Sequence, residues 1–246
     1  MARILQQIQH IVVVMFENRS LDDMCGWLYR DPENPPSTFL PAGCPAGFNG
    51  LNPALWNPRN VSYFSGAPPD KIPVMDSATT FTNPGIDPEE TFVHVTYQIN
   101  GPGPYANPPK YPMQGFVVDY ENATAGNPVE VMEPFSPDQV PVISTLAHHY
   151  AISDAWFCSV PSQTWPNRSF VHTGTSNGNA DNGDHPNPFD WNVPTIFNVL
   201  GDMGIPWTVY SDAVVAPSLT RTMFPKLWDL LLMSSPILNR TVRPAL

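Results

Sequence analysis

Residues 10–20, HIVVVMFENRS, hold the pattern that decides the fold of this chain. The apolar run from Ile11 to Phe16 is short and rich in β-branched side chains, which is typical of a strand buried on both faces of a parallel sheet. In such sheets the ligand crevice lies just beyond the carboxyl ends of the strands. We therefore expect a strand over 10–16, with Glu17 and Asn18 placed where an open α/β protein keeps its chemistry.

The residue types at this strand end fit two interpretations. A carboxylate beside an amide suits a hard divalent cation, or a phosphate held through that cation. Alternatively, Glu17 and Asn18 are polar groups that end a strand and lead into a helix cap. This segment alone leaves both interpretations open.

A second segment, residues 151–178, repeats the same order of an apolar strand and a polar loop. Its loop carries Thr164 just ahead of Pro166, and proline is favoured in the first turn of a helix. Thr164 would then lie near a helix N-terminus, where backbone N–H groups favour an anion. Its hydroxyl is placed to attack a phosphorus atom, with a metal held by Glu17 and Asn18 lowering the hydroxyl pKa. The alternative is that Thr164 only caps the helix.

The rest of the chain predicts an α/β protein with a mostly parallel sheet. We expect further strands over 150–155 and 206–211, and helices over 20–29, 138–149, 166–174, 194–203 and 219–234. The 31 prolines concentrate in 31–72, 101–112 and 123–141, which predicts long ordered loops over a compact core. The length fits one domain over 1–246.

Five segments in order resemble a bacterial phosphoesterase family that joins phosphatidylcholine-type phospholipases C with a group of acid phosphatases. The resemblance covers about residues 8–225, and its segments are HIVVVMFENRSLDDMCGWL (10–28), DPEETFVHVTYQI (87–99), MQGFVVDY (113–120), residues 140–178 and PTIFNVLGDMGIPWTVYSD (194–212). It implies an alkaline-phosphatase-like fold, with helices and long Pro-rich loops around the sheet, and hydrolysis of phosphate esters at a metal site.

The resemblance also implies roles for individual residues. Glu17 and Asn18 match the family's first metal ligands, and Thr164 matches its nucleophile, which also contacts the metal. His94 falls in the segment that supplies an active-site histidine. Arg168, in the T-x-P-N-R signature, binds a phosphate oxygen or holds its loop in place. The implied cofactor is a divalent ion such as Ca²⁺, Mg²⁺, Mn²⁺ or Zn²⁺.

One departure from the family concerns the downstream part of the site. The family completes its site with two adjacent aspartates and a histidine, but no adjacent Asp pair follows Thr164 here. Residues 229–246 also lose the resemblance, so we expect a truncated N-terminal portion of the catalytic domain, or else a member that has shortened. His185, in a polar loop after the nucleophile segment, is a further candidate over the site. The leading hypothesis is a metal-dependent phosphate ester hydrolase, and the alternative is an inactive remnant that binds phosphate or lipid head groups.

Charge and composition limit the partners. The net charge of −11, without a basic cluster, argues against nucleic acid as a partner and against strong docking on an anionic membrane. A phosphate monoester or a phospholipid head group remains compatible with this charge. No run approaches the roughly 18 apolar residues of a membrane span. With no signal peptide at the N-terminus and three cysteines expected to be reduced, we expect a cytoplasmic location, the alternative being a protein of a secreted kind that has lost its leader. The oligomeric state stays open.

Overall fold

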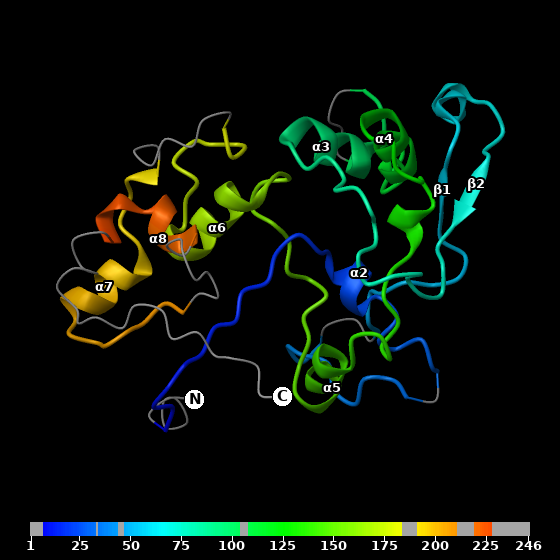
Figure 1. Cartoon of the computed structure of the whole chain (residues 1–246). Coiled ribbons are helices and arrows are strands. Elements are labelled where there is room, and N and C mark those ends of the chain that lie inside the picture. Colours follow the sequence, from blue (N-terminus) through cyan, green and yellow to red (C-terminus); the bar gives the residue numbers. More distant parts are fainter. Residues whose placement is uncertain are drawn as a thin grey trace.

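The computed structural model describes residues 7–32, 34–43, 47–103, 108–183, 191–210 and 219–227. Its helices gather in two groups, and the extended N-terminal segment runs between them (Figure 1). One group holds α6 (Thr164–Thr173), α7 (Ile196–Asp202), α8 (Leu219–Met223) and the 3-10 helix Pro225–Leu227. None of the helices in the described ranges is long and apolar enough to cross a membrane.

The α6 group is built around a small apolar core. Trp191, Met223, Phe224 and Leu227 are almost fully buried and contact one another. Partly buried rings from α6, α7 and the segment after α7 pack on this cluster: Trp165, Phe197 and Trp207. This core holds α6 in place, and α6 carries Thr164 and Arg168.

The second group holds α2 (Leu21–Cys25), α3 (Phe92–Asn100), α4 (Phe116–Ala123), α5 (Pro141–His149), two 3-10 helices (Val61–Ser65 and Glu130–Met132) and a short sheet. The sheet pairs β1 (Trp56–Pro58) with β2 (Lys71–Pro73) in antiparallel register, Trp56 opposite Pro73. Two buried clusters support this group, one around Ile72, Val117 and Met132 and one around Cys25, Leu28 and Ala147.

The predicted strands are the main correction. Segments 10–16, 150–155 and 206–210 form no strand, and residue 211 lies outside the described part. The side chains meant for a buried strand are exposed, by 82% at Ile11, 85% at Val12 and 81% at Phe16. A strand needs hydrogen-bonded neighbours, and among the described residues only β1 and β2 pair. The sheet that the described residues form is therefore antiparallel, and the mostly parallel sheet is not confirmed.

The helix predictions hold better than the strand predictions. The helix expected over 20–29 ends at Cys25, that over 138–149 spans Pro141–His149, and that over 194–203 spans Ile196–Asp202. The helix expected over 166–174 begins earlier, at Thr164. The helix expected over 219–234 begins at Leu219 and ends at Met223, while residues 228–246, with the divergent tail, lie outside the described part. Helices α3 and α4 and both strands lie between the helices predicted over 20–29 and 138–149, where we expect long loops and no helix or strand.

Candidate active site

The loop before α6 is fixed by side-chain amides at its start. Asn167 donates to the carbonyl oxygens of Val160, Ser162 and Gln163, at 2.9, 3.1 and 3.0 Å. Asn182 makes a further hydrogen bond to this region: its Oδ1 accepts from the Trp165 N–H at 2.9 Å. These bonds hold the N-terminus of α6 in one conformation.

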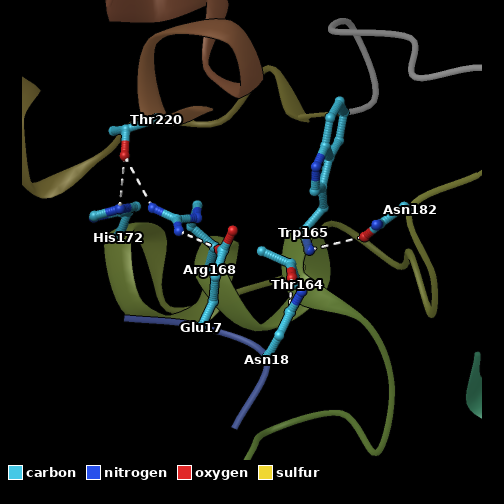
Figure 2. A network of polar contacts seen from close by, with 8 residues as sticks. All are labelled: Glu17, Asn18, Thr164, Trp165, Arg168, His172, Asn182 and Thr220. Atoms are coloured by element: carbon cyan, nitrogen blue, oxygen red, sulfur yellow. Dashed lines mark hydrogen bonds and ion pairs between the residues drawn. The ribbon is translucent and has the colours of Figure 1, made fainter. Parts of the chain in front are cut away.

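Thr164 does not cap this helix. The N-cap residue is Gln163, and its side chain makes no capping hydrogen bond. Thr164 is the first residue of α6, and its hydroxyl donates to Oδ1 of Asn18 at 3.3 Å (Figure 2). The capping alternative is therefore wrong for Thr164, and the structure joins a hydroxyl from α6 to an amide from the N-terminal segment.

Asn18 sits in a backbone conformation that few residues adopt. Its φ is +65°, in the left-handed region that asparagine tolerates better than most residues other than glycine. Helix α2 follows closely, with Ser20 as its N-cap accepting from the Asp23 N–H at 3.1 Å. The turn at Asn18 thus ends the extended segment and directs the amide toward Thr164.

Arg168 links Glu17 to the rest of the α6 group. Its Nη2 donates to Oε2 of Glu17 at 2.6 Å, and its Nη1 donates to the Thr220 hydroxyl at 3.5 Å (Figure 2). The Arg168 side chain is only 12% exposed, while Glu17 is 44% exposed. A charge-assisted bond of this length is strong, so Arg168 offsets the single carboxylate beside Asn18.

His172 lies on the far side of Thr220 in the same network. Its Nε2 is 3.4 Å from the Thr220 hydroxyl, and its ring contacts the rings of Phe197 and Phe224. Burial, and then the positive charge of Arg168, lower the pKa of His172 to about 4. His172 is therefore neutral at pH 7 and leaves Arg168 as the positive charge facing Glu17.

His94 belongs to α3, in the other group of helices. Its Nδ1 lies 2.9 Å from Oδ1 of Asp119. Four residues earlier, burial and then the charges of Asp87, Glu17 and Glu89 raise the pKa of Glu90. The charge of Glu17 thus contributes to the electrostatics at the residue that stands two positions before α3.

The structure therefore brings together four of the residues that the sequence singles out: Glu17, Asn18, Thr164 and Arg168. His94 lies on a neighbouring helix, and His185 lies outside the described residues. Sequence reasoning missed Asp119 as the partner of His94. The signal was available, since Asp119 lies in the segment MQGFVVDY that resembles the family.

The oxygen donors fit part of a site for a hard cation. Glu17, Asn18 and Thr164 supply a carboxylate, an amide oxygen and a hydroxyl, which are the right chemistry for such an ion. They bring one negative charge, however, and Arg168 already faces it. Within the described ranges, no group of three His, Cys, Asp or Glu residues is arranged to hold a metal ion. A complete site would need donors beyond these three.

A hydroxyl at a helix N-terminus, next to an amide, a carboxylate and a buried guanidinium, is an arrangement that can bind an anion such as a phosphate group. Residues 8–238 match the model of the phosphoesterase family, and the chain belongs to this family.

Several curated relatives, from plants and bacteria, are phospholipases C by name. The chain is 34% identical to non-specific phospholipase C1 of Arabidopsis thaliana over 210 residues, which cover 85% of the chain and 35% of that protein. It is 25% identical to non-hemolytic phospholipase C of Burkholderia pseudomallei, over 85% of the chain and 26% of that protein. For phospholipase C A of Mycobacterium tuberculosis the identity is 28%, over 85% of the chain and 38% of the relative. The chain thus spans about a third of the length of these relatives.

Proposed function

We propose that this chain acts in the hydrolysis of phosphate esters, with a phospholipid head group as substrate and Thr164 as nucleophile. The observation that carries the proposal is the bond from the Thr164 hydroxyl to Asn18, which joins two segments 146 residues apart in the sequence. The hydroxyl is not used for capping, so it is available at the N-terminus of α6. The phospholipase C names of the relatives support the choice of substrate.

The remaining residues have distinct roles in this proposal. Asn18 accepts from the Thr164 hydroxyl and so orients its oxygen. Arg168 brings a buried positive charge toward the phosphate, and its Nε is buried with no hydrogen-bond partner among the described residues. A phosphate oxygen would satisfy this donor. The positive end of the α6 dipole favours the same anion, while in this first turn the Trp165 N–H is bonded to Asn182 and Pro166 has no N–H.

We also propose that a divalent cation takes part. Glu17, Asn18 and Thr164 would hold it, and when bound it would supply a lowered pKa at the hydroxyl and neutralise phosphate charge. Ca²⁺, Mg²⁺, Mn²⁺ and Zn²⁺ all remain candidates. Arg168 would then have to share Glu17 with the cation.

The proposed fold extends beyond the sheet that is described. We propose that the chain takes part in the alkaline-phosphatase-like α/β fold that its family membership suggests. Two observations support this: the apolar side chains of segment 10–16 are exposed, and its C-terminal end lies against the N-terminus of α6. Both arrangements are expected for an apolar segment that ends at the ligand edge of such a fold.

The test of the function compares two chromogenic substrates, p-nitrophenyl phosphate and p-nitrophenylphosphorylcholine. The folded protein is assayed with each metal in turn and with chelator, beside Thr164→Ala and Thr164→Ser. The matched control is Thr145→Ala, since Thr145 is exposed on α5. We expect metal-dependent turnover that Thr164→Ala abolishes, that Thr164→Ser partly retains and that Thr145→Ala leaves unchanged. No turnover from folded protein with either ester would overturn the proposal and support a protein that only binds phosphate.

A further inference from the structure

A buried carboxylate on α4 holds two side chains of α3. Asp119 is 8% exposed, and each of its oxygens has its own partner. Oδ1 lies 2.9 Å from Nδ1 of His94, and Oδ2 accepts from Nε2 of Gln98 at 2.8 Å. His94 and Gln98 are four residues apart and so lie on the same face of α3. Both carboxylate oxygens of Asp119 therefore have a hydrogen-bond partner on the same helix, α3.

The close approach of α3 and α4 makes this contact. Gly115, the N-cap residue of α4, lies against the C-terminal half of α3, and its N–H donates to the carbonyl oxygen of Gln98 at 3.0 Å. A Cβ at position 115 would lie 2.1 Å from the carbonyl oxygen of Tyr97, so only glycine fits. From this contact α4 runs past α3, and Asp119 reaches His94 one turn further on.

Gln98 fixes which oxygen of the Asp119 carboxylate faces His94. Its Nε2 donates both to Asp119 and to the carbonyl oxygen of Glu89, each at 2.8 Å. The amide nitrogen is thus held toward Oδ2, and Oδ1 is left for His94. A neutral His94 facing a carboxylate oxygen carries its proton on Nδ1 and leaves the lone pair on Nε2.

The opposite edge of the His94 ring remains available. The side chain is 32% exposed, and no described residue forms a hydrogen bond with Nε2. The charge of Glu17 contributes to the raised pKa of Glu90, which stands two residues before α3.

We propose that Asp119 is a positioning residue that holds His94 with Nε2 toward the phosphate ester bound at Thr164, with Gln98 fixing the orientation of Asp119. This inference rests on the proposed function. A buried ion pair is weak evidence for a purely structural role, because an apolar pair at the same helix contact commonly gives equal or greater stability. A held imidazole with one free nitrogen is instead the arrangement that general acid–base chemistry uses.

The proposed step balances as follows. As the Thr164 oxygen bonds to phosphorus, its proton passes to the free Nε2 of neutral His94, and the bond from phosphorus to the alcohol oxygen breaks. The same proton then passes from Nε2 to the departing alcohol oxygen. In the second half, water gives a proton to Nε2 as its oxygen bonds to phosphorus, the bond from phosphorus to the Thr164 oxygen breaks, and that proton returns to Thr164, so that phosphate, or the phosphorylated head group from a diester, is released. Asp119 faces Nδ1–H throughout and stabilises the imidazolium.

The substitution Asp119→Asn tests the positioning directly. Gln98 still presents its Nε2, so the new amide must turn its oxygen to Gln98 and its NH₂ to His94. His94 must then accept at Nδ1 and carry its proton on Nε2. In ¹⁵N spectra of the neutral ring we expect the Nδ1–H tautomer in the native chain and the Nε2–H tautomer in Asp119→Asn. This readout needs no turnover.

Two further measurements test the placement at the phosphate. Inorganic phosphate with Mg²⁺ should shift the Nε2 signal of His94 in the native chain. In the assay, Asp119→Asn should lower kcat about 10- to 100-fold for a phosphate ester with a poor leaving alcohol, and by less than about 3-fold for the p-nitrophenyl ester. It should add nothing further in a His94→Gln background, because Asp119 acts through His94.

The matched control is Glu133→Gln. Glu133 is also buried and accepts from the Thr79 N–H and hydroxyl, but it holds a loop and touches neither His94 nor the α6 group. It should lower stability without changing the tautomer or the leaving-group dependence. If Asp119→Asn does not fold, Gln98→Leu frees Oδ2 and should lower kcat in the same leaving-group-dependent way.

The outcomes separate the two proposals. An Nε2–H tautomer in the native chain, or a His94 signal that phosphate leaves unmoved, would overturn the positioning role. Equal losses for good and poor leaving groups would do the same. If the native chain shows the expected tautomer and phosphate shift but no turnover, the proposed function fails while the positioning of His94 stands.

Discussion

The guanidinium of Arg168 donates to the carboxylate of Glu17 across 2.6 Å, and these two residues are 151 positions apart. The bond ties the N-terminal segment to α6 at the point where Thr164 meets Asn18 (Figure 2). The bond also means that ligands compete with it. A cation bound at Glu17 would compete with Arg168 for the carboxylate, and a phosphate bound near Arg168 would compete with Glu17 for the guanidinium.

The first prediction concerns this competition. Arg168→Ala removes the positive charge beside Glu17, so a divalent cation should bind several-fold more tightly and inorganic phosphate several-fold more weakly. Titration calorimetry with Mn²⁺ and with phosphate measures both affinities. Arg59→Ala is the matched control, since Arg59 pairs with Glu121 at 2.9 Å on a different part of the protein. A change of the same sign for both ligands would contradict the competition.

The second prediction concerns the packing of α3 on α4. A Cβ at Gly115 would lie 2.1 Å from the Tyr97 carbonyl oxygen, so Gly115→Ala must push the helices apart. We expect a loss of about 2–4 kcal/mol in the free energy of unfolding, measured by urea denaturation. At Gly85 the added Cβ would meet only Glu130 Oε2, at 3.5 Å, so Gly85→Ala should cost little. Equal losses in both variants would show that the close approach is not what requires glycine.

The third prediction follows from the buried His172. Its pKa is about 4 in the folded protein and 6.5 in a free chain, so between these values the unfolded state binds more protons. The contribution of the neutral, buried His172 ring to the free energy of unfolding is fully present above pH 6.5 and is lost as the pH falls toward 4. We expect this loss to be on the order of 1–2 kcal/mol, because the ring keeps some contact with solvent.

The check is a comparison of urea denaturation at pH 7 and pH 4.5 for the native chain and His172→Gln. The variant removes the titrating ring, so its stability should fall less over this range. Carboxylates that titrate near pH 4 contribute equally to both proteins. The same pH dependence in both would contradict the prediction.

The fourth prediction concerns the exposed apolar segment 11–16. Val13 is 75% exposed in an extended segment, and unpaired extended segments of this composition invite association. Val13→Lys should lower binding of a hydrophobic dye and slow aggregation, measured by fluorescence and light scattering. Val142 has the same 75% exposure but lies on α5, so Val142→Lys should change neither. A similar gain from both variants would show that general charge, and not the segment, controls aggregation.

Local sequence predicted the helices well because their signals are local. Pro141 and Pro166 mark helix starts, and the residues that follow carry an apolar face. Asn18 and Thr164 could be chosen from short motifs for the same reason. Helices α3 and α4 were missed because the prolines around them indicate loops, while the close fit at Gly115 that holds them together joins residues far apart in the sequence.

By itself, the sequence determined which residues could do chemistry and where five of the helices lie, α2 and α5 to α8, because both depend on residue type and on neighbours within one or two turns. Only the tertiary structure decided that Thr164 bonds to Asn18, that Arg168 faces Glu17 and that Asp119 holds His94. The strand predicted over 10–16 shows what the local sequence could not determine. Its apolar pattern is real, but a strand exists only when another segment pairs with its backbone, and none of the described residues does so.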